Sequence, residues 1–326
     1  MLDNNLNNII SKTYIIDKKC LNEEKIKRVI SNLKNSIISS KKELIAANNI
    51  DIKNHNGNII DFSIIERIFK NITNETIYYG NVKTLKKDNN KYYGKQYFDR
   101  GNILIFNEGN PYIILEIFLK NFLAGNTSII VTTGYAYGLN KVLENIIKAV
   151  LATNNLSQDF INLFVTNTFE ELLKTNYANI NLVIAIGNKS FQNKIINYSK
   201  VPVLVSGYET FDLYIDEMIN KNFLTKIINL HLPMNVYINK NLKIDLRGSM
   251  LVDGVDEAIM QINYNGNGYS SAIFTSNENN ASNFINKVKS KIVTVNTSPT
   301  IERLMDIMVS DLVLEKTVIY PNQIKK

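Results

Sequence analysis

The chain of 326 residues contains one cysteine, Cys20. A single thiol cannot form an internal disulfide, and it cannot build a metal cage that needs several thiolates. The only two histidines, His55 and His231, have no cysteine or carboxylate cluster near them at metal-ligand spacing. The sequence therefore predicts no metal site.

Long apolar runs are absent as well. No stretch approaches the roughly 18–20 apolar residues that a membrane-spanning helix needs. The first residues, MLDNNLNNIISKTY, are polar and rich in asparagine, without the basic start and apolar middle of a secretory signal. We therefore expect a cytoplasmic protein that does not bind membranes.

The chain also lacks dense basic runs, although its formal net charge is +7. Lysines are scattered along the sequence and form no stripe of the kind that follows a phosphate backbone. We interpret the charge as a mildly basic, solvated surface, and we expect no nucleic-acid partner.

Glycine-rich phosphate loops are missing too. No G-x-G-x-x-G follows a predicted strand, and no G-x-x-x-x-G-K is present. Any nucleotide site in this chain must therefore depart from the common fingerprints.

The most informative stretch that is present runs from Gly101 to Gly134. Ile103 to Phe106 is an unbroken apolar run, typical of a strand that is covered on both faces. Pro111 suits the first position of a helix, and Gly125 can end that helix in the left-handed conformation. Ser128 to Val131 then resumes an apolar run. The pattern predicts a right-handed strand–helix–strand crossover.

The segments before this unit predict helices and a hairpin. An amphipathic helix covers 21–49, with an interruption near Ser39-Ser40, and a shorter one covers 62–69. Partial alternation over 76–96 predicts a projecting hairpin with Asp88-Asn89-Asn90 at its tip.

The segments after it alternate between strands and helices, which predicts a doubly wound parallel sheet followed by a smaller βα series. The predicted strands are 161–165, 181–187, 201–207, 213–215, 235–238, 272–275, 292–295 and 312–320. The predicted helices are 138–152, 169–177, 191–199, 255–263, 280–288 and 300–308.

Ligands of open α/β sheets bind beyond the carboxyl ends of the strands. Three turns follow predicted strands there, and their residues are the candidate cofactor-binding residues: Thr132, Thr133, Gly187, Asn188, Lys189, Ser206 and Gly207. Plain strand-to-helix turns explain the same spacing, and spacing alone favours that reading.

Several segments, in the right order along the chain, carry a family resemblance. Each is given with the family motif that it resembles. They are 42–52 (KELIAANNIDI, similar to ILAAN…D), the Gly125-Asn126 turn (similar to SGN) and 181–189 (NLVIAIGNK, similar to DLIIPRGGK). The others are 201–217 (VPVLVSGYETFDLYIDE, similar to VPV…G…YVDE), 255–273 (VDEAIMQINYNGNGYSSAI, similar to LDEAI…IN.YGSGHT.AI) and 293–298 (VTVNTS, similar to VYVNAST). Together they resemble the gamma-glutamyl phosphate reductase (glutamate-5-semialdehyde dehydrogenase) branch of the aldehyde dehydrogenase superfamily.

The resemblance implies an α/β fold with two doubly wound Rossmann-like domains, the second truncated, and an oligomerisation hairpin completed by the C-terminal strand. It predicts a cofactor-binding-type domain over 1–217, a shortened catalytic-type domain over 218–310 and a C-terminal strand and tail over 311–326. It further implies NADP as cofactor, and a homo-oligomer or a hetero-oligomer with a paralogue.

The reaction of the family is the NADPH-dependent reduction of an acyl phosphate to an aldehyde, through a thioester on a cysteine, on the way to proline. The family's cysteine corresponds here to the segment 233–237, PMNVY, which contains no thiol. The asparagine of its Arg-Pro-Asn corresponds to Tyr112, and the second glycine of its Arg-Gly-Gly corresponds to Asn188. The stretch between 237 and 255 is also several tens of residues shorter than in the family.

The sequence therefore assigns no catalytic residue. The leading hypothesis is a catalytically inactive homologue, a pseudoenzyme, with a binding or assembly role. One alternative is an active NADPH-dependent glutamate-5-semialdehyde dehydrogenase of proline biosynthesis. Another is a nucleotide- or metabolite-binding sensor that uses Gly187, Lys189 and Gly207.

Overall fold

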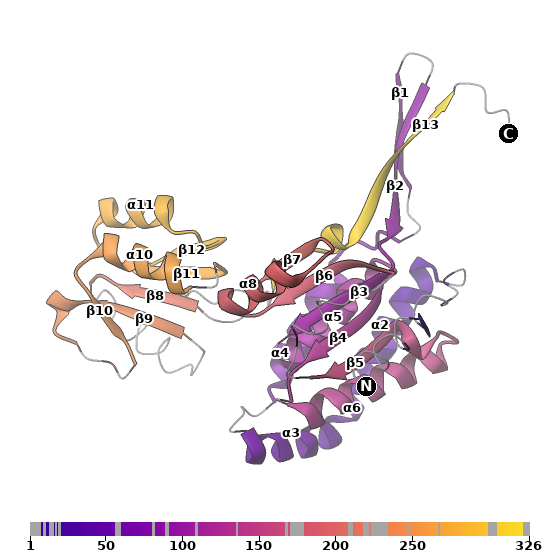
Figure 1. Ribbon diagram of the computed structural model, residues 1–326, viewed down its shortest axis with the longest axis horizontal. Helices are drawn as coiled ribbons and strands as arrows, with labels where there is room; N and C mark the ends of the chain where they lie inside the picture. Colours follow the sequence, from indigo (N-terminus) through magenta and orange to yellow (C-terminus); the bar gives the residue numbers. More distant parts are fainter. Residues whose placement is uncertain are drawn as a thin grey trace. The chain divides into compact units, whose positions relative to one another are not determined.

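The computed structural model divides into two compact units, which are described separately (Figure 1). Unit 1 comprises Met1–Ala185, Ile195–Leu204 and Ile307–Lys326, and unit 2 comprises Ile186–Lys194 and Val205–Asp306. The structure describes residues 8, 11–12, 16, 18, 21–55, 60–79, 82–88, 91–107, 110–134, 136–166, 169, 179–207, 211–217, 222, 234–244, 246, 248–266, 268–298 and 305–321. Cys20 and His231 lie outside these residues, as do 170–177 of one predicted helix.

Unit 1 is built on a five-stranded sheet with the strand order β5-β4-β3-β6-β7. Its strands are β3 (Asn102–Asn107), β4 (Thr127–Thr132), β5 (Ile161–Val165), β6 (Ile180–Ile186) and β7 (Val203–Ser206). β3 pairs with β4, and β4 with β5, in parallel. Every residue of β3 and β4 is buried, as their apolar runs predict. The order is that of a doubly wound nucleotide-binding sheet.

The helices of unit 1 pack against this sheet and against each other. They are α2 (Glu23–Ser39), α3 (Lys41–His55), α4 (Phe62–Thr73), α5 (Pro111–Leu123), α6 (Tyr137–Thr153) and α8 (Lys189–Tyr198), and a short 3-10 helix, η1 (Gln158–Phe160), precedes β5. The predicted interruption near Ser39-Ser40 is confirmed, because α2 ends at Ser39 and α3 begins at Lys41. The unit boundary crosses α8: its residues 189–194, which include Lys189 and Gln192, belong to unit 2, and only its end belongs to unit 1.

Helix α5 is buried on all sides, from Ile113 to Leu123. Two of its buried residues are charged, and they pair with each other: Lys120 Nζ lies 2.6 Å from Glu116 Oε1. Lys120 also donates a hydrogen bond to the carbonyl oxygen of Ile307. A buried charge needs such partners, and here the pair also attaches the segment that leads into the last strand.

A three-stranded antiparallel sheet with the order β1-β2-β13 projects from unit 1 (Figure 1). It consists of β1 (Val82–Asp88), β2 (Lys91–Asp99) and β13 (Val313–Pro321). β13 pairs with β2 along its whole length, from Val313 opposite Asp99 to Pro321 opposite Lys91. The predicted hairpin and its completion by the C-terminal strand are confirmed; the tip residues 89 and 90 lie outside the described ones.

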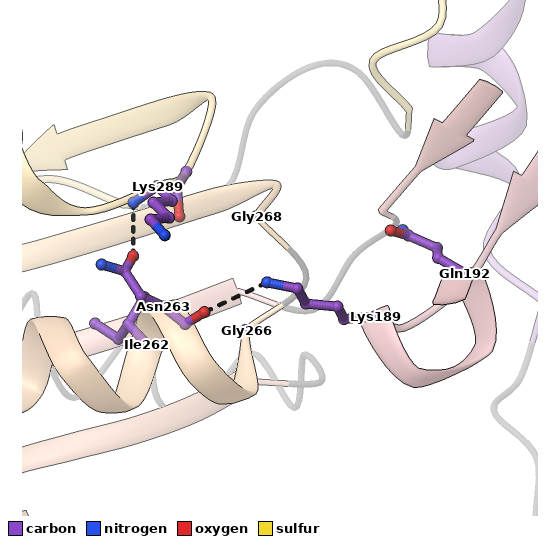
Figure 2. A pocket seen from close by; sticks show the side chains of 8 residues that line it. Lys189, Gln192, Ile262, Asn263, Gly266, Gly268 and Lys289 are labelled. Atoms are coloured by element: carbon purple, nitrogen blue, oxygen red, sulfur yellow. Dashed lines mark hydrogen bonds between the residues drawn. The ribbon is translucent and has the colours of Figure 1, made fainter. Parts of the chain in front are cut away.

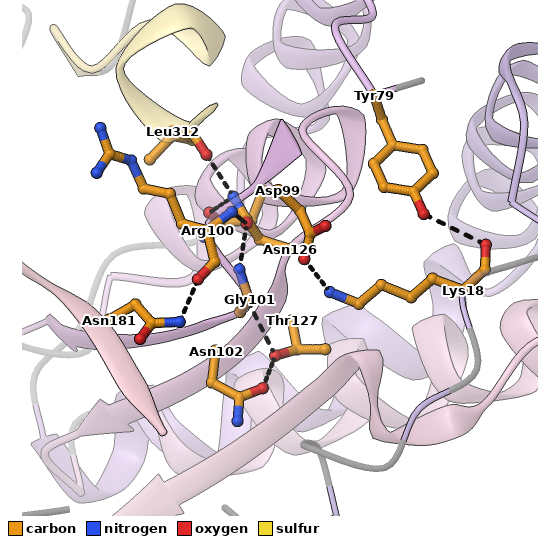
Figure 3. A network of polar contacts seen from close by, with 11 residues as sticks. Lys18, Tyr79, Asp99, Arg100, Gly101, Asn102, Asn126, Thr127, Asn181 and Leu312 are labelled. Carbon is orange, nitrogen blue, oxygen red and sulfur yellow. Dashed lines mark hydrogen bonds and ion pairs between the residues drawn. The ribbon is translucent and has the colours of Figure 1, made fainter. Parts of the chain in front are cut away.

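The buried side chain of Asn126 connects this arm to the sheet (Figure 3). Its Oδ1 accepts hydrogen bonds from the backbone amides of Arg100 and Gly101, at the junction of β2 and β3. Its Nδ2 donates to the carbonyl oxygen of Leu312, directly before β13, at 2.7 Å. One amide thus holds three chain segments together at the amino edge of the sheet.

Unit 2 contains a second five-stranded sheet, with the order β10-β9-β8-β11-β12. Its strands are β8 (Phe211–Ile215), β9 (Met234–Asn239), β10 (Met250–Val252), β11 (Ser270–Phe274) and β12 (Ile292–Val295). β10 pairs with β9, β9 with β8, β8 with β11, and β11 with β12, each in parallel. The helices α10 (Val255–Asn265) and α11 (Glu278–Lys287) contribute to a core cluster that includes Tyr214 and Phe284.

Two features of the structure differ from the sequence-based expectations. β8 lies inside the range 1–217 assigned to the first domain, yet it is the central strand of the unit 2 sheet because it pairs with β9 and β11. The predicted helix over 300–308 is wrong in its described part: residues 305–308 are irregular, and a short 3-10 helix, η3 (Val309–Leu312), begins after them.

The Asn126 contacts generate a test of what holds unit 1 together. Asn126→Ala leaves two half-buried amides and one buried carbonyl group without their partners, and a buried group left unpaired costs about 1–3 kcal/mol. We expect unit 1 to lose about 3 kcal/mol of unfolding free energy, measured by urea titration with hydrogen exchange of β3 and β4 peptides. The matched control is Asn35→Ala, a change of an exposed asparagine on α2 of the same unit, which should change stability by less than about 0.5 kcal/mol. Equal effects of the two substitutions would contradict this role.

Candidate functional site

The first candidate residues lie at the carboxyl end of β4. Thr132 is the last residue of the strand and is fully buried, and Thr133 follows it. In the described part of the chain, Thr132 Oγ1 has no hydrogen-bond partner. This buried hydroxyl is the one feature of the β4 end that suits a ligand.

The helix that follows β4 begins with a cap from elsewhere in unit 1. Asp51, on α3, accepts hydrogen bonds from the backbone amides of Gly138 (3.0 Å) and Leu139 (2.8 Å) in the first turn of α6. The amide groups at a helix N-terminus are the usual seat of a ligand phosphate. Here a carboxylate of the protein already occupies them.

The second candidate turn, Gly187-Asn188-Lys189, follows β6 and opens α8. Asn188 Oδ1 accepts a hydrogen bond from the amide of Phe191, so it caps the helix. Gln192 donates its side-chain amide to the carbonyl oxygen of Gly187. Lys189 Nζ points to the carbonyl oxygen of Asn263, at 3.5 Å (Figure 2).

The third candidate turn, Ser206-Gly207, ends β7. Ser206 Oγ donates to the carbonyl oxygen of Gly207 and lies 3.4 Å from the amide of Asp306. The Ser206 carbonyl oxygen accepts a hydrogen bond from the Gly187 amide, so the structure brings the second and third turns together. These bonds tie the two strand ends to each other.

The position that corresponds to the asparagine of the family's Arg-Pro-Asn also has a structural contact. Asn110 caps α5, since its Oδ1 accepts from the amides of Tyr112 and Ile113. Tyr112 stands at the corresponding position, and its hydroxyl oxygen accepts a hydrogen bond from the amide of Asp61, the residue that caps α4. A side chain bound in this way connects two helices.

The helix N-termini after β3, β4 and β6 are therefore all capped by the protein's own side chains, Asn110, Asp51 and Asn188. A dinucleotide normally places its pyrophosphate on amides of this kind. Among the described residues at these strand ends, the Thr132 hydroxyl is the buried polar group that has no partner.

A small cavity of about 80 Å³ lies between α8 and the start of β11 within unit 2 (Figure 2). Its lining residues are Lys189, Gln192, Ile262, Asn263, Gly266, Gly268, Lys289 and Ser290. Ligand pockets are usually about 300–1,000 Å³. The cavity is therefore too small for a dinucleotide.

The place of the family's nucleophile falls at the start of β9. Asn235 is half-buried there and donates its side-chain amide to Asp212 Oδ1, on β8, at 2.9 Å. Asp212 is fully buried, and its other oxygen has no partner among the described residues. Burial raises the pKa of Asp212 to about 7, although the Asn235 hydrogen bond opposes the rise.

Sequence reasoning missed Asp212. The available signal was a single carboxylate inside the otherwise apolar run FDLYI. A lone acid in a buried strand must either find partners or become protonated.

A second buried carboxylate, Asp216, lies at the opposite edge of the same sheet. Burial opposes its ionisation, but hydrogen bonds from Tyr214, Asn280, Thr275 and Asn239 outweigh burial and lower its pKa. The four donors come from different segments of unit 2, so the cluster joins these segments at the strand ends. Because the oxygens of Asp216 already accept these hydrogen bonds, the carboxylate is poorly available to a ligand.

The described residues around Cys20 lie at the amino edge of the unit 1 sheet (Figure 3). Lys18 forms an ion pair with Asp99, and its carbonyl oxygen accepts a hydrogen bond from Tyr79. Leu21, on the other side of Cys20, is buried at the start of α2. The candidate ligand turns lie at the carboxyl edge, the other end of the strands.

No group of three or more potential metal ligands occurs among the described residues. Of the helices in the described part of the chain, none combines the length and the apolar character needed to cross a membrane.

The Asp212 carboxyl makes the stability of unit 2 depend on pH. Its pKa is higher in the folded protein (about 7) than in a model peptide (3.8). The folded state therefore binds the proton more tightly, and stability falls as pH rises from about 4 through 7. Asp212→Asn should remove this fall, leaving the variant more stable than wild type at pH 8 by a few kcal/mol.

The measurement is urea unfolding at pH 5, 6, 7 and 8, with hydrogen exchange of β8 and β11 peptides as the readout for unit 2. Asp256→Asn, a change of an exposed acid on α10, serves as the control. Parallel pH profiles for wild type and Asp212→Asn would show that this carboxyl is not the titrating group.

No protein-family model matches the sequence. The chain is nevertheless similar to curated proteins over most of its length. A gamma-glutamyl phosphate reductase of Lachnospira eligens is 22% identical, covering 83% of this chain and 82% of the relative. That of Dictyoglomus thermophilum is 24% identical, covering 88% and 85% respectively.

Solved structures show the same fold. The gamma-glutamyl phosphate reductase of Thermotoga maritima matches with a TM-score of 0.66 and 16% identity over 100% of both chains. An aldehyde dehydrogenase of Physcomitrella patens, solved with the product succinate, matches with a TM-score of 0.72 and 11% identity over 98% of this chain and 91% of its own. A glyceraldehyde-3-phosphate dehydrogenase of Methanocaldococcus jannaschii, solved with NADP, matches with a TM-score of 0.69 and 13% identity, covering 98% and 95%.

The resemblance in the sequence motifs, the curated relatives and the α/β fold with parallel sheets agree. The chain is similar over most of its length to curated gamma-glutamyl phosphate reductases, and its fold is like that of solved gamma-glutamyl phosphate reductases and aldehyde dehydrogenases.

Proposed function

We propose that this protein is a non-catalytic homologue of gamma-glutamyl phosphate reductase, which keeps the fold for assembly or binding and has lost the thioester chemistry. The observation that carries the proposal is the pairing of Asn235 with Asp212, at the start of β9 where the family's nucleophile is expected. An amide that is bonded to a buried carboxyl group cannot act as the nucleophile.

The other side chains at this place are no better suited. Reduction of an acyl phosphate in this family uses a thiolate, which displaces phosphate and carries the acyl group as a thioester. The hydroxyl of Tyr237 is two residues further along β9, and burial, followed by the nearby Asp212 charge, raises its pKa to about 12. It is therefore protonated at neutral pH and a poor nucleophile.

The described residues next to the only cysteine in the sequence also support the proposal. The described neighbours of Cys20 are held at the amino edge of β3 through Asp99 and Tyr79. The strand has six residues, which at about 3.3 Å per residue separates its two edges by roughly 17 Å. The candidate ligand turns lie at the carboxyl edge, so the position of Lys18 at the other edge supports the proposal.

The two alternatives are weaker. An active reductase would need a nucleophile that none of the residues above supplies. A dinucleotide sensor would need amide groups at the strand ends, and Asn110, Asp51 and Asn188 already occupy them. Within the part of the chain that the structure describes, the Thr132 hydroxyl is the observation that favours a ligand there.

The reductase activity can be tested directly. Purified protein is incubated with glutamate, ATP, glutamate 5-kinase and NADPH, and the oxidation of NADPH is followed. We expect no turnover above the background without protein, while the Thermotoga maritima reductase provides the positive control. Loss of a covalent nucleophile lowers rates by several orders of magnitude, so the two outcomes are well separated.

Cys20→Ser distinguishes the remaining explanations of any turnover. Activity that disappears in this variant would mean that Cys20 is the nucleophile, and the proposal would be wrong. Activity that survives would require a different mechanism and would equally contradict it. If wild type and Cys20→Ser both oxidise NADPH no faster than the background without protein, the proposal is supported.

The projecting arm supports the assembly half of the proposal. β13 is an edge strand of the β1-β2-β13 sheet, and edge strands readily pair with another chain. Its side chains Leu314 (40% exposed) and Ile319 (54% exposed) are apolar and open to contact. We infer that a second copy of this chain, or a paralogue with an active cysteine, packs against the arm.

Charge substitution on the arm tests this contact. We expect wild type to sediment as an oligomer and the double variant Leu314→Lys, Ile319→Lys to sediment as a smaller species, because charge opposes burial of the arm. Ile285→Lys is the matched control, since Ile285 is 50% exposed on α11 of unit 2. A monomeric wild type that also fails to bind the active reductase would overturn the assembly role.

A further inference from the structure

A cavity in unit 1 lies away from the strand ends and from the arm. Its walls are α2 and α4, and it reaches the last residue of α5, Leu123, and Ile77, which lies beyond α4. Its volume is about 430 Å³, within the range of pockets that hold small organic ligands.

The floor of this cavity is apolar. It consists of five side chains, each less than 10% exposed: Ile30, Phe69, Ile72, Ile77 and Leu123. Water makes few hydrogen bonds on such a surface, whereas a hydrocarbon chain gains free energy by covering it. The floor therefore favours an apolar ligand body.

Polar side chains surround the opening of the cavity, and both lysines among them lie on α2. Lys27, Ser31 and Lys34 follow one another at helical spacing along the α2 side of the opening, and Thr73 and Glu75 line the other side. Lys27 already pairs with Glu23 at 2.6 Å. Lys34 is exposed, and within the described residues it has no ion-pair partner.

We propose that this cavity binds a small amphipathic carboxylate. The hydrocarbon chain lies on the floor of Ile30, Phe69 and Ile72, and the carboxylate lies at the α2 rim, paired with Lys34. The head group stays on the α2 side because Glu75 on the opposite side repels it. This inference rests on the cavity alone and does not depend on the proposed loss of catalysis.

The first experiment is calorimetric titration of the full-length protein with hexanoate, octanoate and decanoate below their micellar concentrations. If the chain lies on the apolar floor, each added methylene should tighten binding about fourfold. The chain contains no tryptophan, so binding can also be followed in variants that carry a single tryptophan as reporter.

Ser31→Trp places a large ring at the mouth of the cavity and should abolish decanoate binding. Ser39→Trp is the matched control: it puts the same ring on the exposed last residue of α2, outside the cavity, and should leave binding unchanged. Circular dichroism and urea unfolding confirm that both variants fold. No saturable binding by wild type, or equal binding by the two variants, would overturn the proposal.

Lys34→Gln tests the head group. We expect decanoate to bind about tenfold more weakly to this variant, and decanol to bind wild type and variant alike. Lys42→Gln, a change of an exposed lysine on α3, serves as the control. Decanoate affinity that is unaffected by Lys34→Gln would show that the carboxylate does not sit at this rim.

Discussion

The amide of Asn126 is the contact on which unit 1 depends most. It is buried, it satisfies two backbone amides and one carbonyl group, and these groups belong to segments far apart in the chain. The surrounding geometry leaves little freedom. Gly125 adopts a positive φ of 78°, and a side chain there would collide with the ring of Tyr79. The turn that presents Asn126 therefore needs this glycine as well as the asparagine.

The two edges of the unit 1 sheet carry different sets of contacts. At the amino edge, hydrogen bonds from Asn126 and the ion pair of Lys18 with Asp99 join the arm to the core. At the carboxyl edge, where this fold usually holds a ligand, side-chain caps occupy the helix N-termini. This division between the two edges fits the structural role that we propose.

Local patterns in the sequence predicted most of this architecture. The apolar runs of β3 and β4 and the interruption at Ser39-Ser40 are properties of short segments, and the structure confirms them. The pairing partners of β8 are different, because parallel strands are joined through distant segments and no local pattern states which sheet a strand enters. The short strand β10 and the irregular residues 305–308 escaped prediction for a similar reason, since their conformation is set by neighbours in space.

In the candidate site, too, local sequence patterns predicted some features, whereas others depend on contacts between distant residues. Strand ends could be located from glycine and threonine turns, so Thr132, Gly187 and Ser206 were found. Whether such a residue is available to a ligand depends on contacts from remote positions, such as Asp51 with the start of α6. The pairing of Asn235 with Asp212 likewise joins residues 23 positions apart. Composition and spacing carry no information on either contact.

The link from Asn126 to Leu312 also bears on how the protein is made. The two residues are 186 positions apart, and ribosomes add about 5–20 residues per second, so roughly 10–40 s pass between their synthesis. Throughout that interval β2 lacks its partner β13, and the whole of unit 2 emerges in between. A nascent chain therefore exposes an unpaired strand edge for tens of seconds before the arm is complete.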